Sequence, residues 1–300
     1  MKTSNPLPPG GDEAMASGAL GGAVILPAVP PQLLYEDSDC GVRLHQGDCL
    51  LFLDDLAAKF PDGCVDMIFA DPPYFLSNGG MTCHSGKRVA VDKGQWDKSR
   101  GADLNHEFNV EWLKRCQRVL KPNGSIWVTG TQHVIFSVGF AMQQLGFKLL
   151  NTIAWEKPNP PPNLSCRYFT HSTETVVWAA KTTSSKHLFH YKLMRQINGG
   201  KQMKAVWRIG APRASEKTFG KHPTQKPVAL VERCISASTN RGDVVLDPFA
   251  GSGTTAVAAL KLGRQFWGID LDLPSVEIAI KRVAHASRMD SLQPVGPGKA

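Results

Sequence analysis

The chain has 300 residues, of which 42% are hydrophobic, and a formal net charge of +8 with an isoelectric point near 9.1. This is enough for one sizeable core, and no apolar run reaches the roughly 18 residues that a membrane span needs. The seven cysteines include no Cys-x-x-Cys pair, which argues against a zinc site or a disulfide framework and indicates a reducing cytoplasm. The positive charge permits a polyanionic partner such as nucleic acid.

Short β-rich segments alternate with amphipathic ones along most of the chain. We expect a disordered tail over residues 1–32, one domain over 33–285, and a flexible tail over 286–300. The predicted strands are, in chain order, 41–48, 64–74, 124–130, 147–157, 173–181, 243–251 and 265–272. The predicted helices are 49–60, 110–120, 133–146, 226–238 and 254–263.

This alternation predicts an α/β fold, with a mostly parallel, twisted sheet and helices on both faces. Two long segments interrupt it and read as irregular. Residues 75–109 are polar and glycine-rich, and residues 182–220 are rich in lysine and arginine. Irregular segments of this length in a compact domain are usually functional or disordered.

The segment DPFAGSGTT, residues 247–255, lies between a predicted strand and a predicted helix. Gly251 and Gly253 allow a tight turn and let a ligand approach the backbone, and the helix begins with unpaired N–H groups. A second acid, Asp270, ends the next strand, where a carboxylate can accept hydrogen bonds from both hydroxyls of a ribose. These features predict a site for a nucleoside-type cofactor.

The glycine segment differs from two familiar phosphate-binding loops. It is not G-x-G-x-x-G, and no Lys-Ser/Thr pair follows its glycines as in a P-loop. A phosphate is therefore not the expected ligand, and Asp247 favours a cationic or amine-bearing one.

The segment FADPPY, residues 69–74, ends another predicted strand with two prolines. Ligands of an open parallel sheet bind at the carboxyl ends of its strands, so we expect Asp71 to lie in the same crevice as the glycine loop. Pro72 and Pro73 remove two backbone donors and stiffen the chain, which leaves a carboxylate and free carbonyls as acceptors. With the flat ring of Tyr74, they suit a planar heterocycle that carries an exocyclic amine.

Together, these two motifs resemble the DNA amino-methyltransferases that use S-adenosylmethionine. The order of the motifs is similar to the beta group, a circularly permuted form of the Rossmann-like methyltransferase fold. The resemblance covers roughly residues 35–285, and its further matching segments are GDCLLFL (47–53), LKPNGSIWV (120–128) and GKHPTQKP (220–227). FADPPYFLSNGG and PNLSCRYFTHSTET look especially like Dpn-type adenine methylases, and HinfI-like enzymes share most of these segments.

The resemblance implies that an adenine is flipped out of the DNA and methylated on its exocyclic nitrogen by direct displacement, with no metal. It assigns the catalytic role to Asp71, Pro72, Pro73 and Tyr74. Residues 222–226 would face the methionine carboxylate, although Lys226 also reads as an ordinary solvated lysine. The residues implied for the cofactor site are Asp48, Asp71, His222, Thr224, Gln225, Lys226, Asp247, Phe249, Gly251, Ser252, Gly253, Thr254 and Asp270.

The basic segment 182–220 lies where the resemblance implies an inserted target-recognition region. Phosphate contacts there would make DNA affinity depend on salt. The residues proposed to contact DNA are Lys192, Arg195, Asn198, Lys201, Gln202, Lys204 and Arg208. Residues 75–109 are expected to close over the flipped base, with Trp96 and His106 as candidates for contact or for a structural role.

Several alternatives remain open. Cytosine-N4 is a second target base, since the Asp-Pro-Pro-Tyr motif favours adenine only by correlation. An RNA or protein-glutamine methyltransferase and a catalytically silent DNA-binding regulator are others, against which Asp71 and the intact glycine loop argue. The expected partners are double-stranded DNA, with single-stranded DNA as a second option, and a second copy of the chain in a homodimer. We expect no membrane association and a cytoplasmic, nucleoid-associated location.

Overall fold

The computed structural model describes residues 28–77, 81–84, 87–90, 97–163, 165–220 and 222–291. Of the two expected tails, only residues 28–32 and 286–291 fall within these ranges, and Trp96 lies outside them. Within the described part of the chain, no helix combines the length and the hydropathy needed to cross a membrane.

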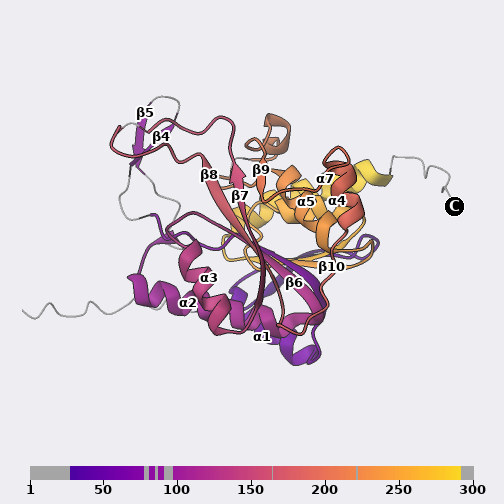
Figure 1. The fold of residues 1–300 in the computed structure, drawn as a ribbon. Coiled ribbons are helices and arrows are strands. Elements are labelled where there is room, and N and C mark those ends of the chain that lie inside the picture. The colour runs from indigo at the N-terminus through magenta and orange to yellow at the C-terminus, as the bar shows by residue number, and fades with distance from the viewer. Residues whose placement is uncertain are drawn as a thin grey trace, which may run out of the picture.

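Nine strands form one central sheet (Figure 1). They are β1 (Gln32–Asp37), β2 (Val42–Gln46), β3 (Val65–Ala70), β6 (Leu120–Gly130), β7 (Lys148–Glu156), β8 (Thr173–Ala180), β9 (Val206–Arg208), β10 (Val244–Asp247) and β11 (Gln265–Asp270). Their order is β1-β2-β11-β10-β3-β6-β8-β7-β9. The pairs from β2 to β6 and the pair β7–β9 are parallel, whereas β1–β2, β6–β8 and β7–β8 are antiparallel. The predicted mostly parallel sheet is thus confirmed.

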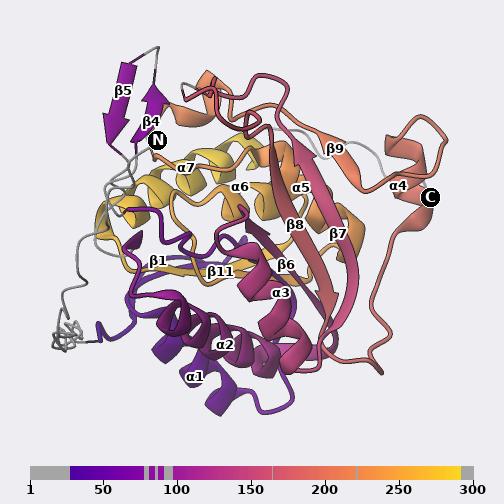
Figure 2. The ribbon, with the colours of Figure 1, turned by 60° about the vertical axis from the view of Figure 1, so that its left-hand side comes forward.

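Helices cover both faces of the sheet (Figure 2). One layer holds α1 (Cys49–Lys59), α2 (Ala102–Val119) and α3 (Ile135–Gln144). The other holds α5 (Val228–Ser238), α6 (Thr254–Lys261) and α7 (Leu273–Ser291). Outside the layers lie α4 (Tyr191–Ile197) and the hairpin β4 (Met81–His84) and β5 (Lys87–Ala90).

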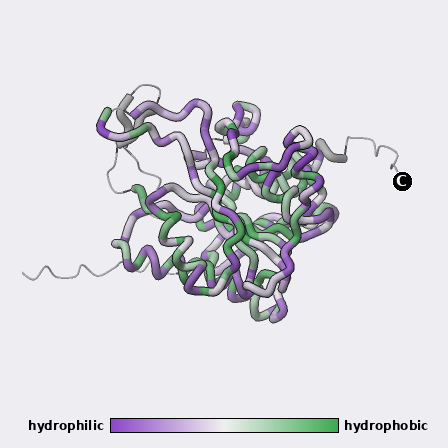
Figure 3. The backbone as a smooth tube through the Cα atoms, in the orientation of Figure 1, coloured by the Kyte–Doolittle hydropathy of each residue, from purple (hydrophilic) through white to green (hydrophobic). Residues whose placement is uncertain are grey.

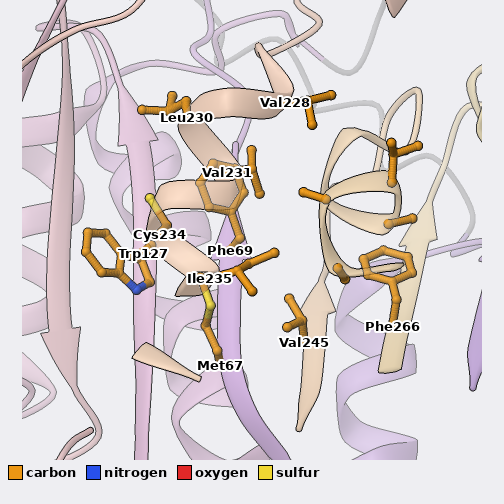
Figure 4. Close-up of a cluster of buried hydrophobic side chains, with 14 of the residues drawn as sticks. Met67, Phe69, Trp127, Val228, Leu230, Val231, Cys234, Ile235, Val245 and Phe266 are labelled. Atoms are coloured by element: carbon orange, nitrogen blue, oxygen red, sulfur yellow. The ribbon is translucent and has the colours of Figure 1, made fainter. Parts of the chain in front are cut away.

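Strand β3 shows why both faces are covered. Its side chains alternate between the faces, and Met67 and Phe69 pack in the cluster with α5, α6 and α7 (Figure 4). Ile68 and Ala70 pack in the cluster with α1, α2 and α3. All four are at most 2% exposed, so this strand is hydrophobic throughout, as expected for a strand buried on both sides. Hydrophobic residues accordingly gather along the central strands in Figure 3.

The strand order brings two distant parts of the sequence together. Strands β3 and β10 are neighbours, with Met67 opposite Val245 and Ile68 opposite Leu246. Asp71 follows β3 directly, and Asp247 is the last residue of β10. Because the two strands are parallel, these acids leave the sheet at the same edge, which confirms the shared crevice predicted for them.

The two segments expected to be irregular contain regular elements. Helix α2 begins at Ala102, eight residues before the predicted 110, since the polar sequence ADLNHEFN shows little apolar periodicity. The segment 182–220 contains α4, β9 and a 3₁₀ turn at Ala214–Lys217. Strand β1 was not predicted.

The C-terminal boundary also differs from the prediction, because α7 continues to Ser291. Residues 286–291 therefore extend the last helix and do not start a flexible tail. Val276, Ala279 and Val283 are fully buried, and their spacing of three and four residues is a helical signal that the sequence offered.

Candidate active site and cofactor pocket

A cavity of about 230 Å³ opens at the carboxyl ends of β3, β10 and β11. Most of the predicted site residues line it: Asp48, Asp71, Pro73, His222, Thr224, Gln225, Lys226, Asp247, Phe249, Gly251, Ser252, Thr254 and Asp270. Three of the residues predicted for catalysis or cofactor binding are not in its lining, namely Pro72, Tyr74 and Gly253. One cavity therefore joins the Asp-Pro-Pro-Tyr segment to the glycine loop.

The glycine loop needs its last glycine for two reasons. Gly253 has φ +74°, in the left-handed region that favours glycine, and caps the start of α6. A Cβ atom there would lie 2.8 Å from the Cβ of Ala279 on α7. Gly253 therefore lets the loop pack against α7 and turn into α6, a backbone role that fits its position outside the cavity lining.

Two carboxylates hold the loop from either side, the buried Asp247 and the half-buried Asp270. Asp247 accepts hydrogen bonds from Thr255 Oγ1 at 2.5 Å and from the Phe249 amide at 2.9 Å. Asp270 accepts from the amides of Gly251 at 2.7 Å and Asp272 at 2.9 Å. Burial raises the pKa of Asp247 to about 7 and that of Asp270 to about 6, although these donors favour the ionised forms.

The charge of the cavity suits a cationic ligand. Its lining has five aspartates, at positions 48, 71, 247, 270 and 272, against one lysine, Lys226. His222 adds little positive charge, because burial lowers the pKa of its imidazole. Among the described residues, the buried Oε1 of Gln225 has no hydrogen-bond partner, while its Nε2 donates to the Glu216 carbonyl. The cavity thus offers acceptors to hydroxyls and to a positive charge, and its one lysine among the described lining residues is paired with Asp71.

The Asp71 carboxylate is held by three donors. Its Oδ1 accepts from Tyr74 Oη at 2.7 Å and from Thr129 Oγ1 at 2.6 Å. Its Oδ2 accepts from Lys226 Nζ at 2.5 Å. The Lys226 side chain is only 8% exposed and that of Asp71 17%, so this is a largely buried ion pair.

Glu174, at the start of β8, completes a network of charges behind Asp71. Its carboxylate accepts from Lys157 Nζ at 2.5 Å and from Tyr74 Oη at 3.2 Å, and lies 3.8 Å from Lys226 Nζ. Burial works to raise the pKa of Glu174, but the two lysines outweigh it, and the net pKa is lowered. Burial lowers the pKa of Lys226, but Asp71 and Glu174 outweigh it, and the net pKa is raised. Both groups are therefore charged.

The network changes the interpretation of two predicted residues. Lys226 is not an ordinary solvated lysine, since it is buried and bonds to Asp71. It also lines the cavity, and its role toward the methionine carboxylate stays a prediction. Tyr74 is 6% exposed, its hydroxyl is held by Asp71 and Glu174, and Lys226 lies 5.2 Å from its ring centre. Burial and the two carboxylates raise the pKa of its phenol well above the ordinary value. The hydroxyl of Tyr74 thus helps to hold Asp71, and stacking of the target base on its ring stays a prediction.

Comparison with known proteins agrees with this geometry. A family model described as DNA methylase, covering N6 and N4 enzymes, matches residues 65–281. The chain belongs to the N6/N4 DNA methylase family.

The chain is similar to curated type II methyltransferases. It is 56% identical to M2.LlaDCHI of Lactococcus lactis subsp. cremoris over 229 residues, which cover 76% of this chain and 85% of the relative. It is 55% identical to M2.DpnII of Streptococcus pneumoniae over 227 residues, which cover 75% and 85%. The crystal structure of an M1.HpyAVI–SAM complex matches with a TM-score of 0.62 and 29% identity, over 81% of this chain and 98% of that one. This methylase is thus a DNA methyltransferase that depends on S-adenosylmethionine.

The cavity of the methylase fits this cofactor. Asp270 retains lone pairs for ribose hydroxyls, the orphaned oxygen of Gln225 can accept from an ammonium group, and the excess of carboxylates suits a sulfonium. Several lining residues went unpredicted, and they are Gly47, Cys49, Phe69, Phe108, Pro248, Ala250, Thr255, Leu271, Asp272 and Ser275.

Two further residues of the methylase support the site, although sequence reasoning missed them. Asp97 is fully buried, and its carboxylate accepts hydrogen bonds from the backbone amides of Tyr74, Phe75 and Leu76 and from Ser77 Oγ. It fixes the turn in which Phe75 adopts φ +57°.

The second is Arg282, which reaches from α7 into the glycine loop. Its Nη1 donates to the Ser252 carbonyl at 2.6 Å and to Thr254 Oγ1 at 3.1 Å, and the residue is 5% exposed. Neither residue carried a sequence signal, because each is an isolated charge distant from the motif that it holds.

The residues proposed to contact DNA lie near the β9 edge of the sheet, on α4, in the segment leading to β9 and, for Arg208, at the end of β9 itself. Strand β9 is four places from β3, or about 19 Å at the ordinary spacing of strands. Arg195 donates to the Gly200 carbonyl, and Asn198 donates to the carbonyls of Lys201 and Gln202. These two side chains therefore stabilise their own turn. Lys192, Lys201, Gln202, Lys204 and Arg208 are exposed, and their DNA contact stays a prediction.

His106 contacts other protein groups, since its ring lies within hydrogen-bonding distance of Ser137 Oγ and Gln144 Oε1 and stacks on Phe140. Of the two roles considered for it, the structure supports the structural one.

The raised pKa of Asp270 generates a prediction for cofactor binding. Ribose hydroxyls bond best to an ionised carboxylate, and Asp270 becomes protonated as the pH falls through about 6. We expect the dissociation constant of S-adenosylmethionine, measured by calorimetry, to rise by up to about tenfold per pH unit below that point. Asp270→Asn should bind more weakly and lose this part of the pH dependence. A wild-type constant that is flat between pH 5 and 7.5 would contradict the assignment.

The anchoring role of Asp97 generates a second prediction. Asp97→Ala leaves buried donors of the catalytic turn without an acceptor, and we expect it to lower the free energy of unfolding by about 2–4 kcal/mol and to abolish methylation. Urea denaturation measures the first effect. Asp55→Ala, which removes an exposed acid on α1, is the matched control. Equal stability of the two variants would refute the anchoring role.

Proposed function

We propose that this methylase transfers a methyl group to the exocyclic N6 of a flipped-out adenine in a short DNA motif. The observation that carries the proposal is the position of Asp71, held by three donors at the end of β3, in the wall of the cofactor cavity. Aspartate at the first position of the Asp-Pro-Pro-Tyr motif supports adenine as the base.

The hydrogen bonds of Asp71 leave room for an amine. A carboxylate has about four lone-pair sites, of which Tyr74, Thr129 and Lys226 occupy three. The remaining site is on Oδ2, beside Lys226, where it can accept one hydrogen of the exocyclic amine. The Pro72 carbonyl can accept the other. Two such acceptors localise the nitrogen lone pair and stabilise the positive charge that develops on that nitrogen.

The charges around Asp71 balance one another. Asp71 and Glu174 are balanced by Lys226 and Lys157, so that the network has no net formal charge. An ionised carboxylate held by fixed donors needs no reorganisation when charge appears on the substrate. We therefore assign Lys226 to the orientation of Asp71.

S-adenosylmethionine supplies an electrophilic methyl group on a sulfonium. We assign Asp270 to its ribose, Asp48 to the region of its adenine, and His222, Thr224 and Gln225 to its methionine part. Phe249, Gly251, Ser252 and Thr254 form the wall beside it, and Asp247 and Gly253 hold that wall in shape.

The biological role follows the type II relatives. We propose that the methylase modifies double-stranded DNA, and single-stranded DNA as a second substrate, within a restriction–modification system. A cytoplasmic, nucleoid-associated location and a homodimer remain part of this proposal, and the mass of the protein in solution at micromolar concentration tests the dimer.

Identification of the modified nucleoside tests the proposed function directly. Incubation with S-adenosylmethionine and unmethylated genomic DNA, followed by single-molecule sequencing, should give N6-methyladenine in one short motif. N4-methylcytosine would retain the mechanism and overturn the base. Absence of any modification of the DNA would overturn the substrate class.

The network around Asp71 predicts a graded pair of variants. Asp71→Asn removes the charge, and we expect the rate of transfer to fall by about 10²–10³-fold while S-adenosylmethionine still binds. Thr129→Val removes only one donor and should reduce the rate by about five- to tenfold. Single-turnover methylation measures both. Asp55→Asn should leave the rate unchanged, and full turnover by Asp71→Asn would exclude the proposed role.

A further inference from the structure

The segment between β7 and β8, residues 158–172, leaves the sheet directly above the catalytic network. At its base, the Lys157 amide donates to the Ser172 carbonyl at 2.8 Å, and Lys157 Nζ pairs with Glu174 at 2.5 Å. Glu174 in turn contacts Tyr74. Thr175 of β8 lies opposite Gly130, the last residue of β6, so the segment emerges from the edge of the sheet at which Asp71 lies.

The rising arm of this segment is stiff. It contains Pro158 and the run Pro160, Pro161, Pro162, and each proline fixes its own φ. The chain bends at Pro158 and Asn159 and then passes through the three successive prolines, which restrict its backbone. Figures 1 and 2 show the segment standing out at the upper end of the sheet, near β4 and β5.

The tip of the segment is braced so that two aromatic rings face outward. Asn163 Nδ2 donates to the Tyr168 carbonyl at 2.5 Å, and Asn163 Oδ1 accepts from the amide and the hydroxyl of Ser165. Cys166 turns the chain with φ +52°. Tyr168 is 59% exposed and Phe169 is 96% exposed.

The composition of the segment favours a nucleic-acid partner. It contains no Asp or Glu, whereas Arg167 beside the two rings is a cation. The His171 ring packs against Tyr168 with centroids 5.2 Å apart. Exposed aromatic rings next to positive charge stack on bases and accept phosphates, and apolar side chains at a DNA interface insert between base steps.

We propose that Phe169 is a wedge that enters the base stack of duplex DNA beside the target adenine and fills the space which the flipped base leaves. In this proposal Tyr168 stacks on the neighbouring base, and Arg167 binds the phosphate backbone. This inference rests on the proposed function, because a wedge is needed only where a paired base must leave a duplex. It assigns DNA contact to a segment that sequence reasoning had not included in target recognition.

The test compares duplex with single-stranded substrate. Wild type, Phe169→Ala, Phe169→Trp and Asn163→Ala are incubated with labelled S-adenosylmethionine and either native or heat-denatured unmethylated genomic DNA. We expect Phe169→Ala to lose at least tenfold in initial rate on native DNA and to stay within about twofold of wild type on denatured DNA. Phe169→Trp should retain activity on both, and Asn163→Ala, which releases the brace, should repeat the duplex-specific loss.

The matched control is Phe60→Ala, which removes a phenylalanine that is 42% exposed. Phe60 lies between α1 and the start of β3, at the end of that strand opposite to Asp71. This variant should methylate both substrates at the wild-type rate. Equal activity of Phe169→Ala and wild type on native DNA would overturn the wedge, and so would an equal loss on both substrates. If the wild type methylates neither DNA, the proposed function fails and takes this inference with it, an outcome that is seen before any variant is compared.

Discussion

The buried ion pair between Asp71 and Lys226 joins the two halves of this enzyme. Lys226 lies in the segment that leads into α5, and Asp71 follows β3 directly. In the sequence, 155 positions separate the two residues. Charges this deeply buried persist only when paired and hydrogen-bonded, and loss of one partner of such a pair costs about 3–5 kcal/mol. The pair therefore holds the catalytic strand against the segment that borders the cofactor cavity.

The neighbours of this pair determine what it can do. If Lys226 faced Asp71 alone, its charge would compete with the substrate amine for the carboxylate. Glu174 also attracts Lys226, and Lys157 in turn pairs with Glu174. Tyr74 and Thr129 both bond to Oδ1, so Oδ2 is the oxygen left with a free lone pair. The side chains that tune the acceptor thus come from β3, β6, β8 and the segment before α5, and the order of strands in the sheet is what brings them together.

Sequence reasoning could predict what local pattern encodes. The strand ending in Asp-Pro-Pro-Tyr, the glycine loop and the acid at Asp270 each have a signature within a few residues, and all three meet in the cavity as expected. It could not predict contacts between distant single residues. Asp97, Arg282 and Glu174 are isolated charges whose partners lie 17 or more positions away, and the contacts that Tyr74 and Lys226 make with Glu174 could not be foreseen for the same reason.

The same sheet edge also places the chemistry and the proposed DNA contacts in a fixed relation. The cofactor cavity opens where β3, β10 and β11 end, and the proline-braced segment rises from the ends of β7 and β8, farther along the same edge. Its base is the Lys157–Glu174 pair, which belongs to the catalytic network. Only two hydrogen bonds separate the base of this segment from Tyr74, namely Lys157 to Glu174 at 2.5 Å and Tyr74 to Glu174 at 3.2 Å. The segment proposed to contact DNA and the side chain that holds Asp71 therefore share one ionised neighbour, Glu174.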